Sequence, residues 1–157
     1  MELKSNEEKI TRALLVSVDT GEYDAQASLD ELFELVKSAG ADPVLSVTQN
    51  LQKIEKGTFV GTGKLAEIAE ICESQEIDLL VFDSELSPTQ IKNIEAETDV
   101  RVIDRTTLIL DIFAQRARSK EGKLQVELAQ LKYAPKTYGQ RYRNVKTRRR
   151  YRHKRSG

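Results

Sequence analysis

The sequence predicts an α/β fold: a small parallel sheet of about four strands with flanking helices, followed by two helices and a disordered basic tail. Short apolar, β-branched runs alternate along the chain with segments whose apolar residues recur every three or four positions. Parallel neighbours in a sheet require a connection long enough to hold a helix. The alternation therefore favours a parallel sheet over strands joined by hairpins.

Four apolar runs predict the strands, and their composition is typical of strands that are covered on both faces. They are residues 12–19 (RALLVSVD), 42–48 (DPVLSVT), 79–83 (LLVFD) and 100–103 (VRVI). Pro43 lacks a backbone N–H, so it is compatible with the second strand only at that strand's beginning or at an edge of the sheet.

The first helix is predicted between residues 26 and 40, where one face carries Leu29, Leu32, Phe33 and Val36. Ser28 and Glu31 match a capping box at its start, and Gly40 is a helix stop. A polar, Gly-containing loop is expected from residue 51 to 62. A second helix, 64–74, repeats the same spacing with Leu65, Ile68, Ala69 and Cys72.

A third, short helix is predicted after Ser87, which forms a capping box with Gln90 and places Pro88 at the favoured first position. Its apolar face consists of Ile91 and Ile94. Two more helices are predicted at about 108–118 and 123–133. In the last of them, apolar side chains form a stripe that must pack against something: Leu124, Leu128 and Leu131.

The chain divides into a polar leader (1–11), an α/β domain (12–105), a helical linker segment (106–134) and a basic tail (135–157). The tail holds 10 basic residues and no acidic one. Subtracting these 10 from the chain's 25 basic residues leaves 15 against 25 acidic residues in 1–134, a net charge of −10 there. The net charge of zero thus conceals an acidic body with a cationic tail.

The composition indicates a cytoplasmic protein. No apolar run is long enough to span a bilayer, and the polar leader lacks the apolar core that a signal peptide has. The single cysteine, Cys72, has no partner for an internal disulfide and is predicted to be a buried thiol.

The turn Gly61-Thr62-Gly63-Lys64 is a weak candidate for nucleotide binding, because glycines expose backbone N–H groups at a helix start and lysine adds positive charge. It departs from a Walker A motif at both ends, since Thr58 stands where glycine is required and Leu65 where serine or threonine is required. A structural Gly-rich turn is the simpler interpretation.

Four carboxylates are expected near strand ends, where ligands of open α/β sheets bind: Asp83, Glu85, Asp104 and Asp111. No histidine or cysteine accompanies them, and no set of nucleophile, base and orienting group is recognisable. We therefore predict no catalytic residue and no metal site, and interpret the domain as a binding module.

A cationic cluster, defined as Arg105, Arg116, Arg118, Lys120 and Lys123, surrounds the turn between the last two helices. Such groups neutralise nucleic-acid phosphates. The alternative is a solvated helix end with local ion pairs to Asp111 and Glu121.

Three segments of the chain resemble the HflX family of ribosome-associated GTPases: residues 58–70 (TFVGTGKLAEIAE), 79–95 (LLVFDSELSPTQIKNIE) and 104–133 (DRTTLILDIFAQRARSKEGKLQVELAQLKY). The resemblance covers residues 12–133, the N-terminal domain and first linker helices of that family. It implies a protein that binds the large (50S) ribosomal subunit and its RNA, hydrolyses GTP with Mg²⁺ and acts in ribosome splitting or rescue. In that family the N-terminal and helical regions reach ribosomal RNA, so the resemblance favours the cationic cluster as an RNA contact. None of the family's GTPase motifs can be placed on these residues, so the resemblance implies no cofactor for this chain.

The resemblance ends at Ala134, before the family's GTPase domain. Reading plausible codons for residues 135–157 one base later yields PRLMGKGTEMSKLGGGIGTKGPG, which resembles the family's continuation. We hypothesise that a small deletion shifted the reading frame and truncated the protein. The alternative is an evolved RNA-binding tail, in which Tyr142 and Tyr151 suit base stacking. The gene sequence decides, because a frameshift requires a GTPase-like frame downstream.

Three functions follow from these observations. The first is a truncated HflX-like ribosome-binding fragment without GTP hydrolysis. The second is a standalone RNA-binding adaptor that uses the basic tail. The third is a small nucleotide-binding regulator, because ATP binding has been suggested for the family's N-terminal domain.

Overall fold

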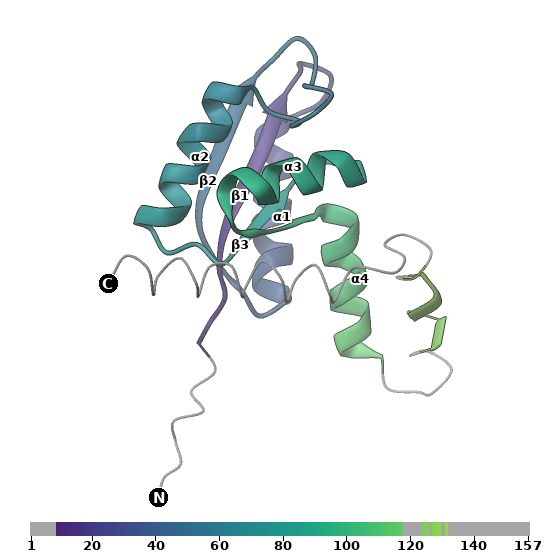
Figure 1. Ribbon diagram of the computed structural model, residues 1–157. Helices are drawn as coiled ribbons and strands as arrows, with labels where there is room; N and C mark the ends of the chain where they lie inside the picture. Colours follow the sequence, from purple (N-terminus) through teal and green to yellow (C-terminus); the bar gives the residue numbers. More distant parts are fainter. Residues whose placement is uncertain (1–8, 118–123, 126, 130, 132–157) are drawn as a thin grey trace, which may run out of the picture.

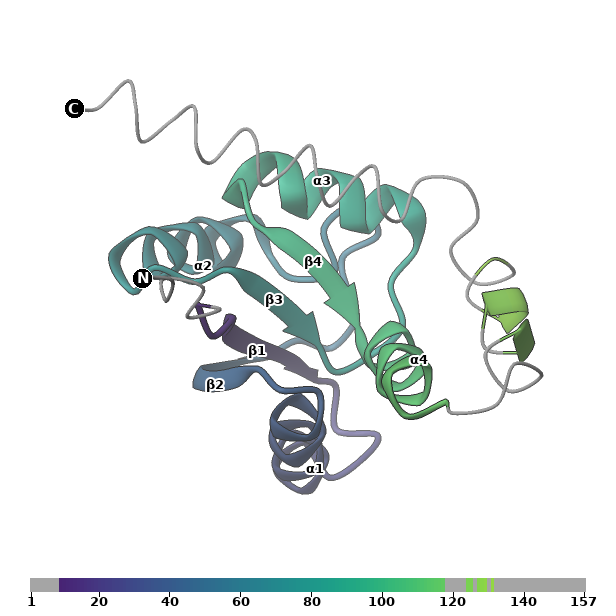
Figure 2. The same ribbon diagram turned by 90° about the horizontal axis from the view of Figure 1, so that it is seen from below.

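The computed structural model describes residues 9–117, 124–125, 127–129 and 131. A four-stranded sheet lies between two layers of helices (Figures 1 and 2). The elements, in chain order, are β1 (Arg12–Asp19), α1 (Ala25–Ser38), β2 (Asp42–Asn50), α2 (Thr62–Ser74), β3 (Leu79–Phe82), α3 (Pro88–Thr98), β4 (Arg101–Asp104) and α4 (Arg105–Arg116). The predicted α/β class is confirmed.

The strand order is β2-β1-β3-β4, and every neighbouring pair is parallel. Strands β1 and β3 therefore lie inside the sheet, while β2 and β4 form its edges. Pro43 is the second residue of edge strand β2, next to an irregularity in the register between Ala13 and Leu14. This is the position that its missing N–H requires.

Alternating side chains of β1 supply two separate cores, because successive residues of a strand point to opposite faces of the sheet. Leu14 and Val16 belong to the larger core, which includes residues of α2 and α3. Ala13 and Leu15 belong to the other, which includes residues of α1 and α4. Figure 2 shows the two helix pairs on opposite sides of the sheet.

Several local predictions are confirmed. The predicted bounds of β1 agree with the structure, and the other strands differ by one or two residues at an end. Ser87 and Gln90 form the predicted capping box of α3, with Pro88 in its first turn. Gly40 follows the end of α1 with a φ of +88°, a conformation that glycine adopts without strain. Cys72 is buried in the larger core.

The predicted capping box of the first helix was wrong, although the predicted start differs from the observed one by a single residue. Helix α1 begins at Ala25, and the side chain of Asp24 caps it by accepting a hydrogen bond from the Ala27 N–H at 3.0 Å. Ser28 therefore lies inside the first turn, and its hydroxyl contacts Arg105 instead. Phe33, predicted to be a core residue, is exposed beside the ammonium of Lys37, which lies 4.6 Å from the ring centroid.

The loop predicted to be polar between residues 51 and 62 contains two core residues. Phe59 and Val60 are buried, and the ring of Phe59 meets that of Phe82 edge to face at 5.8 Å. Phe59 has a φ of +65°, a strained value for an aromatic residue. The cost is offset by its burial and by paired backbone hydrogen bonds with Glu55.

Helix α4 begins at Arg105, three residues earlier than predicted, because Asp104 ends β4 and also caps the helix. Beyond it, residues 124–125, 127–129 and 131 are helical, within the predicted last helix. The basic tail and the first residues of the leader lie outside the described residues. Among the helices that the structure describes, none is long and apolar enough to cross a membrane.

Candidate functional site

The carboxyl ends of the four parallel strands lie at one edge of the sheet, together with the N-termini of the helices that follow them. The chain leaves β1 for β2 through α1 on one face, and leaves β3 for β4 through α3 on the other. The topological switch point therefore lies between the carboxyl ends of β1 and β3, and ligands of open α/β sheets bind at such points.

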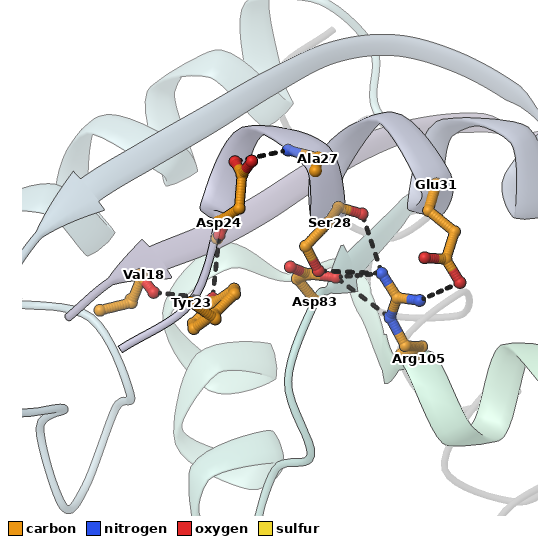
Figure 3. A network of polar contacts seen from close by, with 9 residues as sticks. Val18, Tyr23, Asp24, Ala27, Ser28, Glu31, Asp83 and Arg105 are labelled. Atoms are coloured by element: carbon orange, nitrogen blue, oxygen red, sulfur yellow. Dashed lines mark hydrogen bonds and ion pairs between the residues drawn. The ribbon is translucent and has the colours of Figure 1, made fainter. Parts of the chain in front are cut away.

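Arg105 is the centre of a polar network at this edge (Figure 3). Its Nη2 and Nε both donate to Oδ1 of Asp83, at 2.8 and 3.1 Å, and its Nη1 donates to Glu31 at 3.0 Å. Nη2 also contacts the carbonyl and hydroxyl oxygens of Ser28, at 2.8 and 3.1 Å. One guanidinium thus joins the start of α4 to the end of β3 and to the first turns of α1.

The electrostatics of this network favour a permanent cation. Burial lowers the pKa of Arg105, but the hydrogen bond and charge of Asp83, together with those of Glu31, outweigh this effect and raise the pKa above its ordinary value. Only 1% of the Asp83 side chain is exposed, and its Oδ2 is a buried oxygen without a hydrogen-bond partner in the described chain. The arginine is therefore the principal counter-charge of a buried carboxylate.

Asp104 has a comparable structural role. It is fully buried, its Oδ1 accepts from the Thr107 N–H as the cap of α4, and its Oδ2 accepts from the Leu86 N–H at 3.0 Å. Of the other carboxylates predicted near strand ends, Glu85 is exposed in the loop after β3. The placement of Asp111 was wrong, since it lies in the middle of α4.

The Gly61-to-Lys64 turn lies at the start of α2, with Gly61 as the cap residue. Gln49 accepts a hydrogen bond from the Gly61 N–H at 2.9 Å, and a Cβ at Gly61 would lie 3.1 Å from Nε2 of the same side chain. A side chain at Gly61 would therefore require the end of the Gln49 side chain to shift by a few tenths of an ångström. The ammonium of Lys64 pairs with Glu67 on the next turn at 3.1 Å.

This geometry does not fit a GTP–Mg²⁺ site. The backbone N–H of Gly61 already donates a hydrogen bond to Gln49, and the ammonium of Lys64 is paired with Glu67 of the same helix. In the described ranges, no three histidine, cysteine, aspartate or glutamate side chains gather closely enough to hold a metal ion.

The cationic cluster is only partly described. Arg116, at the end of α4, donates from Nη2 to the hydroxyl of Ser38 at 2.6 Å and is exposed. Arg105 is instead turned into the protein, where 21% of its side chain remains accessible. Arg118, Lys120 and Lys123 lie outside the described residues. Of the two members that are described, Arg116 is the one available to a partner.

Two contacts at the switch point were not predicted. The hydroxyl of Tyr23 donates to the carbonyl of Val18 at 2.9 Å and lies 3.4 Å from that of Ser17, so it closes the loop after β1 (Figure 3). Glu31 was assigned to a capping box, whereas it pairs with Arg105. Neither contact has a local signal, because both depend on where the strands end.

Residues 26–114 match the family described as GTP-binding GTPase N-terminal. The chain belongs to this family. It is 52% identical over 134 residues to the GTPase HflX of Lacrimispora saccharolytica, a match that covers 85% of this chain and 31% of that relative. With the GTPase HflX of Escherichia coli it shares 46% identity over 122 residues, covering 78% of this chain and 29% of the relative.

Solved structures agree with the family assignment. The structure of SsGBP in complex with GDP has a TM-score of 0.64 and 28% identity, covering 88% of this chain and 41% of that one. A GTP-binding protein from Sulfolobus solfataricus in complex with GDP has a TM-score of 0.62 and 27% identity, with 88% and 44% covered. The chain therefore corresponds to the N-terminal part of HflX-type GTPases and spans about a third of the length of the curated relatives.

Proposed function

We propose that this chain is a non-catalytic, cytoplasmic binding module that associates with the large (50S) ribosomal subunit through ribosomal RNA. The match of residues 26–114 to the N-terminal family of GTP-binding GTPases carries the proposal. GTP, Mg²⁺ and an action in ribosome splitting or rescue are proposed only for full-length members, because the described residues hold no site that fits them.

The distribution of charge indicates where RNA would bind. Residues 1–134 have a net charge of −10, which repels RNA from most of the α/β domain. The exposed Arg116 begins a run that continues with Arg118, Lys120 and Lys123 and contains a single acidic residue, Glu121. We propose this run as the phosphate contact, without Arg105, whose guanidinium is already bonded to Asp83 and Glu31.

Co-sedimentation with purified 50S subunits tests the proposal. A variant with Arg116, Arg118, Lys120 and Lys123 all changed to glutamine should lose at least about tenfold in affinity, because four phosphate contacts disappear. The matched control changes four lysines elsewhere to glutamine and should bind like the wild type: Lys53, Lys56, Lys64 and Lys92. Equal binding by the quadruple variant and the wild type would refute the assignment, and GTP hydrolysis by the purified chain would refute a non-catalytic module.

A standalone RNA-binding adaptor is the second candidate, favoured by the 10 basic residues of the tail. Removal of residues 135–157 separates the two functions. Binding to 50S subunits that survives this deletion supports the module, whereas binding that disappears with the tail supports the adaptor.

A further inference from the structure

Strand β2 is an edge strand with one free side. It lies at the end of the sheet and pairs only with β1, along its whole length from Asp42 to Asn50 (Figure 2). An unpaired edge presents backbone N–H and C=O groups in the geometry that a further extended strand requires. Proteins usually protect such an edge with charged side chains, proline or a bulge. The composition of β2 therefore determines whether its free side is open to a partner.

The protection of β2 is confined to its N-terminal end. Asp42, Pro43 and the register irregularity opposite Ala13 and Leu14 all lie there. Residues 43–52 (PVLSVTQNLQ) contain no charged side chain, in a chain of which 32% of the residues are charged. A second copy of the chain can therefore approach this edge about a twofold axis without bringing like charges together.

The backbone groups on the free side belong to Ser46, Thr48 and Asn50. Immediately after β2, the N–H of Leu51 donates to the carbonyl of Asp19, the last residue of β1, at 3.1 Å. Successive residues of a strand direct their backbone groups to opposite sides, so residues 46, 48 and 50 direct theirs away from β1. All three are exposed, and within the described residues their outward N–H and C=O groups have no hydrogen-bond partner.

We propose that β2 pairs with β2 of a second copy of this chain in antiparallel orientation, about a twofold axis at Thr48. In this register Thr48 faces its own copy, and Ser46 of each chain faces Asn50 of the other. Each facing pair exchanges two backbone hydrogen bonds, so about six bonds join the two copies. The two four-stranded sheets become one continuous sheet.

The same register covers the exposed leucine of β2. Leu45 is 43% exposed, and it pairs in register with Leu14 of the larger core, so its side chain lies on the face of the sheet that carries α2 and α3. Leu51, which packs against that core, lies on the same face. A twofold axis at Thr48 places Leu45 of one copy opposite Leu51 of the other. The apolar contact and the backbone hydrogen bonds therefore favour the same partner in the same register.

Sedimentation equilibrium of the full chain from about 1 μM to about 1 mM tests the pairing, because an interface of this small size associates weakly. The wild type should dimerise. Leu45→Lys should raise the dissociation constant about tenfold or more, because it replaces both apolar contacts of the dimer by a charged edge. The matched control Ile54→Lys changes a residue of the loop after β2 that is 41% exposed, and it should dimerise like the wild type.

A backbone variant provides a second test. Thr48→Pro removes an outward N–H that β1 does not use, so the ladder between β1 and β2 keeps its hydrogen bonds. The dimer should lose its two central hydrogen bonds, and the dissociation constant should rise about tenfold or more. Circular dichroism melting verifies that every variant keeps the folded α/β domain.

Disulfide trapping tests the register. Facing residues of an antiparallel pair have Cα atoms about 5.5 Å apart, within the range that a disulfide spans. Thr48→Cys should cross-link with itself, whereas Ser46→Cys should cross-link with Asn50→Cys and only slowly with itself. A wild type that stays monomeric overturns the proposal, as does a dimer that either Leu45→Lys or Thr48→Pro leaves intact. Cross-linking of Ser46→Cys with itself as fast as that of Thr48→Cys overturns the register.

Discussion

Replacing Arg105 by methionine should destabilise the α/β domain more than any other change of an exposed or partly exposed charge. Methionine keeps most of the side-chain length but cannot donate the hydrogen bonds to Asp83, Ser28 and Glu31. The Asp83 carboxylate would remain in place with 1% exposure and with neither oxygen bonded to a cation.

The magnitude follows from the burial of the carboxylate. Removing one partner of a buried ion pair costs about 3–5 kcal/mol, because the remaining charge stays desolvated. The Arg105 side chain is 21% exposed, so water can reach the vacated space and the lower end applies. We expect a loss of about 3 kcal/mol, a large share of the roughly 5–15 kcal/mol that stabilises an ordinary domain.

Urea unfolding followed by circular dichroism measures this loss as a lower midpoint at an unchanged slope. Arg116→Met is the matched control, since Arg116 makes one exposed hydrogen bond to Ser38, and it should change stability by less than about 0.5 kcal/mol. The double variant Asp83→Leu with Arg105→Met should recover a substantial part of the loss, because no charge is left buried. If Arg105→Met costs less than about 1 kcal/mol, the network in Figure 3 is not a determinant of stability.

Three further changes test other parts of the structure by the same unfolding assay. Ile68→Ala should cost about 2–5 kcal/mol because Ile68 is fully buried in the larger core, and a cost below about 1 kcal/mol would place it elsewhere. Ser87→Ala should cost about 1 kcal/mol through loss of the α3 cap, while Thr89→Ala, at an exposed position of the same turn, should be nearly neutral. Gly63→Ala should raise stability by about 0.5–1 kcal/mol, because a Cβ there meets no atom within 4 Å, and a loss would indicate a requirement for glycine that packing does not explain.

The pH dependence of the arginine network provides the last prediction. The pKa of Arg105 is raised in the folded protein, so its contribution to stability is present below the unfolded pKa and is lost only as the pH rises through the higher, folded value. Both values lie above the working range, since arginine stays protonated there. The difference between wild type and Arg105→Met should therefore be equal at about pH 7 and about pH 10, and a difference that shrinks at the higher pH would contradict this reasoning.

Much of the fold could be predicted because its signals are local. The capping box of α3 spans four residues, from Ser87 to Gln90, and the strand β1 is recognisable from its unbroken apolar run. Errors arose where two local signals competed. Ser28 and Glu31 match a capping box, but Asp24 is the residue that caps α1. Phe59 lies in a polar stretch of sequence, but its ring packs on that of Phe82.

The candidate site was predictable only in outline. The positions of Asp83 and Asp104 near strand ends followed from the strand pattern, because carboxyl ends of parallel strands share one edge. The role of each carboxylate could not be predicted, because a carboxylate that caps a helix or pairs with an arginine has the same sequence signal as one that binds a ligand. Asp104 caps α4 and Asp83 holds Arg105, and both roles depend on neighbours that the chain brings together in space.

The sequence by itself determined the alternation of strands and helices, the acidic body, the basic tail and the spacing of Leu124, Leu128 and Leu131, since each is a property of neighbouring residues. Only the tertiary structure decided the function of Arg105 within the domain. Its partners lie 22, 74 and 77 residues away along the chain, at Asp83, Glu31 and Ser28. The parallel sheet brings the end of β3 beside the start of α4, so that the Arg105 guanidinium neutralises the buried carboxylate of Asp83.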